Sequence, residues 1–375
     1  MLYYLFEFLK RAYDVPGLGA FKYITTRSAA AAVTSLIVAF FVGPKIIEWL
    51  KKNQIGEAKK IDAPKTHWSK EGTPTMGGII IVLAIVIPVI LWADVLSVYI
   101  WIILAATLWL FGVGLLDDYL KVVKKYHKGL IERYKLILQF IIGLVVGLAV
   151  YFAPEFEQVR TETTLPFFKN LNLDFGDLYI PVVIFIIMGT ANAVNLTDGL
   201  DGLAAGTVAI SMLTLAIFSY VTGNVVYSDY LNIIYLAGAG ELTIFCAAAA
   251  GATLGFLWFN SYPAQVFMGD TGSLALGGAL GTLAVLVKKE LLLPILGGIF
   301  FAETLSVIIQ RAYFKYTKRK YGEGRRVFKM APLHHHFELL GWPEPKIVVR
   351  FYIIAIILAI VSLTLSLFFS MRFAK

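Results

Sequence analysis

The chain has 375 residues, of which 58% are hydrophobic and 15% are charged, and its mean hydropathy is +0.75. This composition excludes an ordinary soluble domain, because a water-exposed surface needs many more charged side chains. The net charge of +8 does not indicate a nucleic-acid partner, since the basic residues lie between apolar runs, as in membrane proteins. The single cysteine, Cys246, excludes a disulfide within the chain.

About ten long apolar runs predict an all-α integral membrane protein that forms a single polytopic membrane domain over residues 1–375. A bilayer core is roughly 30 Å thick, so one helical span needs about 20 apolar residues. The expected spans are residues 28–49, 76–95, 98–116, 136–153, 179–197, 203–222, 237–257, 272–288, 291–311 and 347–370. Residues 1–27 lack a small-residue cleavage site and are expected to form an N-terminal interfacial segment.

The charges between these spans predict the orientation of the chain. Lys and Arg concentrate after the odd-numbered spans, and cytoplasmic loops carry an excess of these residues. Residues 312–346 are therefore expected to be a cytoplasmic loop, residues 154–178 an extracytoplasmic loop, and both termini are expected outside. Lys10, Arg11, Lys22 and Arg27 mildly oppose this orientation, and an error of one span would reverse it.

Unusual polar clusters end the odd-numbered spans and are expected on the cytoplasmic face. They are residues 70–78 (KEGTPTMGG), Asp117–Asp118, residues 195–202 (NLTDGLDG), residues 260–270 (NSYPAQVFMGD) and the triplet His334–His336. Polar groups are costly inside a membrane, so their repeated placement on one face indicates a common site.

The acidic residues have a structural and a functional interpretation. The adjacent carboxylates of Asp117 and Asp118 repel each other unless a cation offsets them, which indicates either Mg²⁺ or a basic neighbour such as Lys121. Asp270 precedes a predicted helix, where an aspartate is also an ordinary N-cap.

Two further polar clusters also have both a functional and a structural interpretation. Asn195, Asp198 and Asp201 recur every three residues, which makes them neighbours on a helix that could bind ligand hydroxyls or a hydrated metal. A helix end followed by a turn is the plainer interpretation. The histidine triplet cannot share one helical face, so either a bent loop presents two rings to a phosphate or metal, or the loop is simply solvated.

Three other positions are of interest. Lys70, with the hydroxyls and glycines that follow it, suits an anionic ligand. Phe267 could stack on a base or pack at the membrane interface. Glu303 lies within an apolar span, where it either has a functional role or pairs with Gln310 or a basic neighbour.

Six motifs in order carry a resemblance to a known family. They are TPTMGG, DDY, NAVNLTDGLDGLA, FLWFN, FMGDTGSL and APLHHHFE. Together they resemble the phospho-N-acetylmuramoyl-pentapeptide transferases, a branch of the polyprenyl-phosphate phosphosugar transferases, and the likeness runs from about residue 22 to residue 372. The resemblance implies ten spans in the bacterial inner (plasma) membrane, an active site on the cytoplasmic face, Mg²⁺ as cofactor and a homodimer. The implied reaction moves phospho-MurNAc-pentapeptide from UDP-MurNAc-pentapeptide to undecaprenyl phosphate, which gives lipid I and UMP in peptidoglycan synthesis.

The resemblance also implies roles for individual residues. The implied catalytic residues are Asp117, Asp118, Asp270, His334, His335 and His336, and the implied metal ligands are Asp270, Asp117 and Asp118. The implied substrate-binding residues are Lys70, Thr75, Lys121, Lys135, Asn195, Asp198, Asp201, Asn260, Phe267 and Gly269.

Other functions compete with this interpretation. A related transferase would use UDP-N-acetylglucosamine as donor. A secondary transporter would place its polar site near the bilayer midplane, whereas these clusters sit at span ends. A structural scaffold leaves the one-sided clustering unexplained. Direct attack by the carrier phosphate and a covalent aspartyl intermediate both remain open from sequence.

Overall fold

The computed structural model describes residues 1–53, 70, 72–126 and 129–368. Within these residues, seven helical segments are long and apolar enough to cross a membrane, and the number rises to eight if one bent pair is a single span. The seven segments contain α2 (Ile24–Lys52), α4 (Val98–Val122), α5 (Glu132–Phe152), α6 (Tyr179–Thr197), α7 (Leu203–Thr222), α9 (Leu242–Asn260) and α14 (Glu344–Leu363). The chain is therefore a multi-pass membrane protein, and the predicted all-α fold is confirmed.

Each of the ten expected spans contains a helix. One of these helices, α12 (Gly298–Tyr321), qualifies as a span only together with the segment before it, and two more do not qualify. α3 (Gly78–Trp92) has only 15 residues, and α10 (Gly269–Leu286) is rich in glycine. The count of ten spans therefore stays a prediction.

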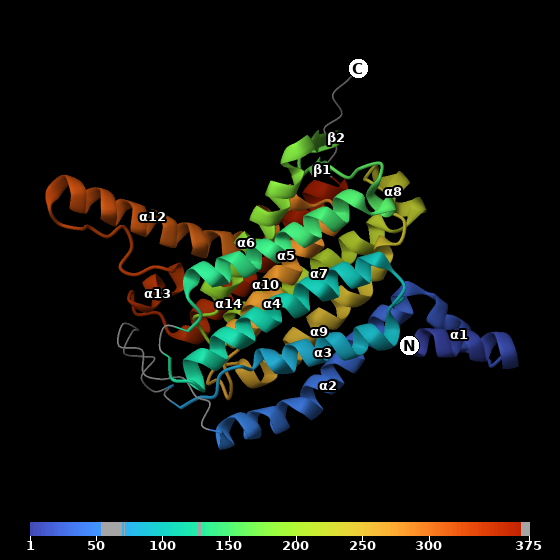
Figure 1. Ribbon diagram of the computed structural model, residues 1–375, viewed down its shortest axis with the longest axis horizontal. Coiled ribbons are helices and arrows are strands. Elements are labelled where there is room, and N and C mark those ends of the chain that lie inside the picture. The colour runs from blue at the N-terminus through green and yellow to red at the C-terminus, as the bar shows by residue number, and fades with distance from the viewer. Residues whose placement is uncertain (54–69, 71, 127–128, 369–375) are drawn as a thin grey trace.

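α10 lies at the centre of the bundle, in contact with α3, α4, α6 and α7 (Figure 1). Every residue from Thr271 to Leu286 is buried. Its glycines permit this position, since a Cβ at Gly281 would lie only 2.3 Å from Oγ1 of Thr190 on α6. Small residues let membrane helices approach closely. Because α10 faces other helices, it does not need the apolar surface of a lipid-facing helix.

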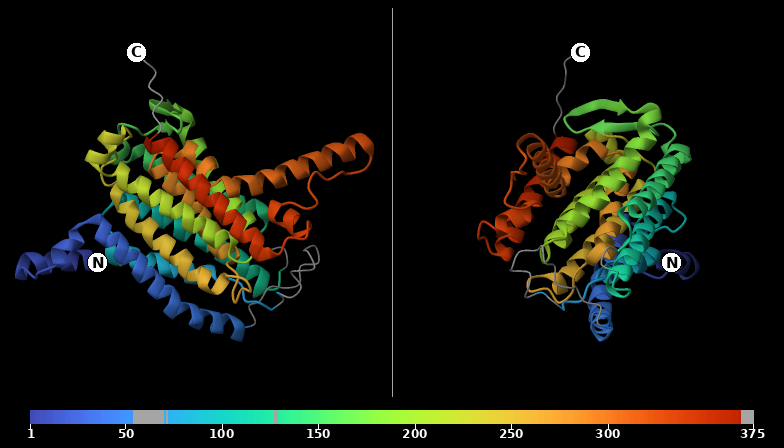
Figure 2. Two further views of the ribbon diagram at one scale, coloured as in Figure 1. Left: turned by 180° about the vertical axis from the view of Figure 1, so that it is seen from behind. Right: turned by 60° about the vertical axis from the view of Figure 1, so that its left-hand side comes forward.

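The expected span at residues 291–311 is broken in the structure. The segment Glu290–Leu296, which contains α11 (Leu293–Leu296), meets α12 (Gly298–Tyr321) at an angle of 83°. α12 then leaves the bundle and projects from its side (Figure 2). The glycines at the junction remove the side chains that would resist such a kink.

The expected cytoplasmic loop at residues 312–346 is partly helical. It holds the last turns of α12, which continues to Tyr321, and the short helix α13 (Leu333–Glu338). The histidine triplet lies on α13.

The expected loop at residues 154–178 contains a small antiparallel hairpin. In this hairpin β1 (Glu162–Leu165) pairs with β2 (Phe168–Asp174). The hydroxyl of Thr163 donates a hydrogen bond to the buried carboxylate of Glu290, which fastens the hairpin to the helical bundle.

The N-terminal helix α1 (Leu2–Tyr13) lies beside the last turn of α3. The terminal ammonium group donates hydrogen bonds to the carbonyl oxygens of Ile90 at 2.5 Å and Leu91 at 3.1 Å. α2 already begins at Ile24, and the interfacial placement of residues 1–27 stays a prediction. The remaining short elements are α8 (Val225–Leu231), 3₁₀ turns at Leu18–Lys22, Pro154–Phe156, Gly176–Leu178, Ala239–Glu241 and Glu290–Leu292, and a π turn at Thr364–Phe368.

Candidate active site

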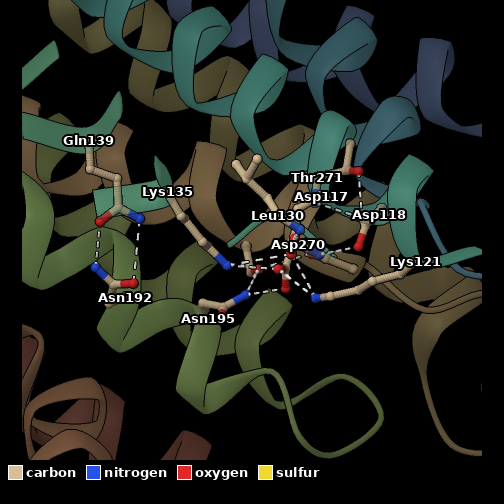
Figure 3. A network of polar contacts seen from close by, with 12 residues as sticks. Asp117, Asp118, Lys121, Leu130, Lys135, Gln139, Asn192, Asn195, Asp270 and Thr271 are labelled. Atoms are coloured by element: carbon tan, nitrogen blue, oxygen red, sulfur yellow. Dashed lines mark hydrogen bonds and ion pairs between the residues drawn. The ribbon is translucent and has the colours of Figure 1, made fainter. Parts of the chain in front are cut away.

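Polar residues from α4, α5, α6 and α10 meet at one end of the bundle (Figure 3). The end of α4 carries Asp117 and Asp118, the first turn of α10 carries Asp270, the start of α5 carries Lys135, and the end of α6 carries Asn195. One carboxylate oxygen from each aspartate lies within 4.8 Å of the other two. Three sequence clusters that are far apart along the chain are therefore adjacent in space.

Asp270 is the centre of this network. Its Oδ2 accepts hydrogen bonds from Nζ of Lys121 at 3.0 Å and from Nζ of Lys135 at 2.8 Å. Its Oδ1 accepts a hydrogen bond from Nδ2 of Asn195 at 2.7 Å, and this amide also donates to Oγ of Ser273 at 2.8 Å. Charge-assisted bonds of this kind fix the orientation of a carboxylate.

Asp117 is buried beside the same lysines. Its Oδ1 accepts a hydrogen bond from the backbone N–H of Leu130 at 2.6 Å, and its Oδ2 lies 2.6 Å from Nζ of Lys121. Nζ of Lys135 lies 3.7 Å from Oδ2. Three neighbouring carboxylates thus face two ammonium groups, which offset most of the repulsion between them.

Asp118 caps the start of α10. Its carboxylate accepts hydrogen bonds from the backbone N–H of Asp270 at 3.2 Å and of Thr271 at 2.9 Å, and from the Thr271 hydroxyl at 2.6 Å. The first N–H groups of a helix have no partner within the helix, so a carboxylate from another helix stabilises this end. The sequence allowed Asp270 to be the N-cap, whereas Asp118 caps the helix and Asp270 extends into the network.

Glycines set the spacing of the three aspartates. Gly269 has a φ of +71°, and a Cβ at this position would lie 2.5 Å from Oδ2 of Asp118. A Cβ at Gly114 would lie 2.1 Å from the carbonyl oxygen of Asp270, and one at Gly78 would lie 2.1 Å from the backbone nitrogen of Gly272. The backbones of α3, α4 and α10 therefore touch directly around the site.

A second polar group surrounds Lys70. Its Nζ donates hydrogen bonds of 2.6 Å to Oδ1 of Asp201 and of 2.6 Å to Oε1 of Glu344. The other oxygen of Asp201 accepts a hydrogen bond from the backbone N–H of Ala264 at 3.0 Å. Burial alone would lower the pKa of Lys70, but its hydrogen bonds to Asp201 and Glu344 outweigh burial and raise the pKa above its ordinary value.

The turn between α6 and α7 differs from the continuous helix that the three-residue spacing suggested. α6 ends at Thr197, so Asp198 and Asp201 lie in the turn while Asn195 remains on the helix. Asn195 contacts Asp270, whereas Asp201 contacts Lys70, so the two residues belong to different polar groups.

Asn260 and the backbone of Phe267 hold the surrounding loops together. The buried amide of Asn260 donates to the carbonyl oxygen of Val266 at 2.9 Å and accepts from the backbone N–H of Gly202 at 3.0 Å. Thr75 is buried. Phe267 is partly exposed, and its backbone carbonyl accepts a hydrogen bond from the N–H of Gly77 at 2.8 Å.

The three histidines have different surroundings. His334 is buried, with Nδ1 lying 3.2 Å from Oε1 of Glu303. Nδ1 of His335 lies 2.7 Å from Oε2 of Glu338, and Nδ1 of His336 accepts a hydrogen bond from the backbone N–H of Lys329 at 3.1 Å. Among the described contacts, none joins a histidine ring directly to Asp117, Asp118 or Asp270.

The carboxylates of Asp117, Asp118 and Asp270 could hold a metal ion. Their oxygens form the hard donor set that Mg²⁺ favours, and they outnumber the two lysines that face them. Sequence reasoning missed Glu344, Thr271 and Ser273. Glu344 follows Pro343 at the start of α14, which is the ordinary pattern of a helix start and carries no signal of a site.

Comparisons with known proteins identify the family of the chain. A family model described as Glycosyl transferase family 4 matches residues 100–288, and Phospho-N-acetylmuramoyl-pentapeptide-transferase signature 1 matches residues 70–82. A phospho-N-acetylmuramoyl-pentapeptide-transferase of Chloroherpeton thalassium is 55% identical over 97% of this chain and 98% of its own length. Proteins of the same name from Chlorobium limicola and Chlorobium chlorochromatii are each 53% identical over the same shares. Because this likeness spans nearly the whole length of each protein, the chain belongs to the phospho-N-acetylmuramoyl-pentapeptide transferase family.

Proposed function

We propose that this chain transfers phospho-MurNAc-pentapeptide from UDP-MurNAc-pentapeptide to undecaprenyl phosphate, with lipid I and UMP as products. The names of relatives that are 52–55% identical to it supply the donor class. The observation that carries the proposal is the cluster of Asp117, Asp118 and Asp270 with Lys121 and Lys135, which is suited to handling phosphate anions.

The charges of this cluster match the demands of the reaction. Donor and acceptor are both phosphate anions, so they approach each other only where positive charge offsets their repulsion. Lys121 and Lys135 would bind phosphate oxygens of the two substrates. Mg²⁺ held by Asp117, Asp118 and Asp270 would neutralise the donor pyrophosphate and the departing phosphate.

The chemical step is a displacement at phosphorus. An oxygen of the carrier phosphate forms a bond to the phosphorus next to the sugar, the bond from this phosphorus to the bridging oxygen breaks, and UMP leaves with the electron pair. The carrier phosphate is largely ionised at neutral pH, so Asp117 orients it and accepts its remaining proton where one is present.

The rest of the site would bind the donor. Asn195, Asp198, Asp201, Asn260, Phe267 and Gly269 are proposed to form the nucleoside pocket, together with Lys70 and Thr75. The histidines of α13 are proposed to act at its edge. We also propose a homodimer in the bacterial inner membrane, with this site in the cytoplasm and both termini outside.

The test uses purified full-length protein in detergent with radiolabelled UDP-MurNAc-pentapeptide, undecaprenyl phosphate and Mg²⁺. Wild-type protein should give a lipid-extractable product that requires all three components, and UDP-N-acetylglucosamine should not replace the donor. Asp270→Asn should lower the rate by at least about 100-fold, as expected when a charge-stabilising group is lost. Asp229→Asn, at an exposed aspartate of α8, should keep the wild-type rate.

The outcomes separate the proposal from its rivals. A product formed only from UDP-N-acetylglucosamine would reassign the donor, and no product from either donor would refute the transferase. UMP released stoichiometrically with enzyme in the absence of undecaprenyl phosphate would replace direct attack by a covalent intermediate.

A further inference from the structure

We propose that Glu303 of α12 is a positioning residue for this transfer, and that it holds His334 against the turn that carries Asp198 and Asp201. This inference rests on the proposed function and goes beyond the residues assigned to it. It follows from a buried acid that the carboxylate cluster does not use.

Glu303 is fully buried in α12, a little beyond the 83° bend. The sequence allowed it to pair with Gln310, but the Oε1 of Gln310 accepts the backbone N–H groups of Val327 and Phe328, each at 3.0 Å. The partner of Glu303 is instead His334, on a different helix. Burial of a carboxyl group in an apolar helix costs free energy. We therefore infer that the carboxyl group of Glu303 has a role in the protein.

Glu303 caps the start of α13 from a neighbouring helix. Its Oε1 accepts a hydrogen bond from the backbone N–H of His334 at 3.1 Å. The N-cap residue of α13 is Pro332, whose side chain has no oxygen to accept this bond. The first N–H groups of a helix need an outside acceptor, and Glu303 supplies it here.

The same oxygen of Glu303 also lies close to the imidazole ring of His334. Nδ1 of His334 lies 3.2 Å from Oε1 of Glu303, which is within ion-pair range although the angles do not make a hydrogen bond. The backbone bond is therefore the directional contact, and the ring contact is a close approach to the same oxygen. Together the two contacts fix both the start of α13 and the side of the ring that faces α12.

The opposite side of the ring is pressed against Gly199. A Cβ at Gly199 would lie 2.1 Å from Nε2 of His334 and 2.7 Å from its Cε1. The turn can approach the ring this closely only because residue 199 has no side chain. Gly199 directly follows Asp198 and lies two residues before Asp201, so the ring forms one wall of this turn.

Other contacts already fix the rest of the turn. Asp201 is held by Lys70 and by the N–H of Ala264, and the N–H of Gly202 is held by Asn260. Glu303 and His334 brace the turn at Gly199. Loss of the Glu303 carboxyl should therefore displace the donor-binding turn and leave the acidic cluster on α4 and α10 in place.

The experiment compares steady-state kinetics of the full-length enzyme and its Glu303→Ala, Glu303→Gln and Gly199→Ala variants, with each substrate varied in turn. Glu303→Ala and Gly199→Ala should raise the KM for UDP-MurNAc-pentapeptide by at least about 10-fold, because small displacements of binding groups have large kinetic costs. The KM for undecaprenyl phosphate should change by less than about 2-fold. Glu303→Gln keeps an oxygen that can accept the His334 N–H, and should stay within about 3-fold of wild type.

Thr304→Ala is the matched control, since Thr304 neighbours Glu303 on α12. Among the described residues, its hydroxyl bonds only the carbonyl of Phe300, at 2.9 Å, within its own helix. It should leave both KM values unchanged. A fall in kcat of Glu303→Ala with both KM values unchanged would indicate a merely structural role and overturn the proposal. An equal loss in Glu303→Gln would overturn it as well, because the acceptor oxygen would not be what matters. Absence of transfer by the wild-type enzyme would instead refute the proposed function, so the two failures are distinguishable.

Discussion

Lys121 and Lys135 contact Asp270, one of the three aspartates that could hold a metal ion. Both ammonium groups donate to the same oxygen, Oδ2, at 3.0 Å and 2.8 Å. A lysine in this position stabilises the carboxylates when no metal is bound, and it repels a cation that approaches them. The lysines therefore compete electrostatically with the proposed Mg²⁺ for this cluster of carboxylates.

Replacement of Lys135 by Met should strengthen metal binding while it weakens catalysis. Removal of one nearby positive charge should lower the dissociation constant of Mn²⁺, used in place of Mg²⁺, by about 10-fold, which corresponds to about 1.4 kcal/mol. Electron paramagnetic resonance of free Mn²⁺ measures this constant without turnover. Lys124→Met, at an exposed lysine near the end of α4, should leave it unchanged. Weaker Mn²⁺ binding by Lys135→Met would contradict the competition.

The sequence predicted the residues of this site better than their contacts. The adjacent carboxylates of Asp117 and Asp118 are unusual beside a membrane span, but their grouping with Asp270 was expected from the one-sided placement of the polar clusters and from the family resemblance. Asp118 caps α10, whereas Asp270 contacts the lysines. These different roles depend on how α4 and α10 pack, which the sequence does not show. Glu344 carried no signal because its chain position is that of an ordinary helix start.

At the scale of elements, α5 and α6 are joined by a pair of amide side chains within the bundle (Figure 3). Nδ2 of Asn192 donates to Oε1 of Gln139 at 2.7 Å, and Nε2 of Gln139 lies 3.4 Å from Oδ1 of Asn192. Gln139 is one helical turn beyond Lys135, and Asn192 is three residues before Asn195. The amide pair thus aligns the two helices that deliver Lys135 and Asn195 to Asp270.

The pair should behave as a coupled unit in a double-mutant cycle. Gln139→Leu or Asn192→Leu alone leaves a polar amide without its partner, whereas the double variant removes both groups. The coupling free energy should be about 1 kcal/mol, in the range measured for hydrogen bonds between membrane helices. Unfolding of the four proteins in detergent measures it. Additive single effects would show that the amides do not act together.

The sequence predicted the helices well and the broken helix poorly. Apolar runs located each expected helix, because a bilayer fixes span length. The run at residues 291–311 continues without interruption across the bend at Gly297. Hydropathy predicts whether a segment is stable in the apolar part of a membrane, but it does not predict where a helix bends.

At the scale of the whole molecule, the end of the bundle opposite the acidic cluster has its own buried ion pair. Arg27 donates to the two oxygens of Glu241 at 2.8 Å and 2.6 Å, and its guanidinium carbon lies 4.3 Å from the centre of the Tyr3 ring. Glu241 also accepts the backbone N–H of Asp94 at 2.9 Å. Arg27 mildly opposed the predicted orientation, and this pairing neutralises its charge inside the protein.

Loss of either Arg27 or Glu241 should destabilise the fold without affecting substrate binding. Arg27→Met leaves the Glu241 carboxylate without its cation, which should lower the free energy of unfolding by about 3–5 kcal/mol. Arg27→Met with Glu241→Leu should recover part of this loss. Thermal unfolding in detergent measures stability, and the KM of either substrate should stay at its wild-type value because the pair lies at the far end of the helices. A change in KM would contradict the separation of the two ends.

The direct backbone contacts of α10 with α3 and α4 limit which substitutions this protein can accept. At Gly78 and Gly114 even a methyl group would meet backbone atoms at 2.1 Å, so no neighbouring side chain can turn aside to make room. A larger residue at either position would require an entire helix to move, and this movement would separate the aspartates of the site. We therefore expect larger side chains to be tolerated less readily at Gly78 and Gly114 than on the lipid-facing surface or in the connecting segments.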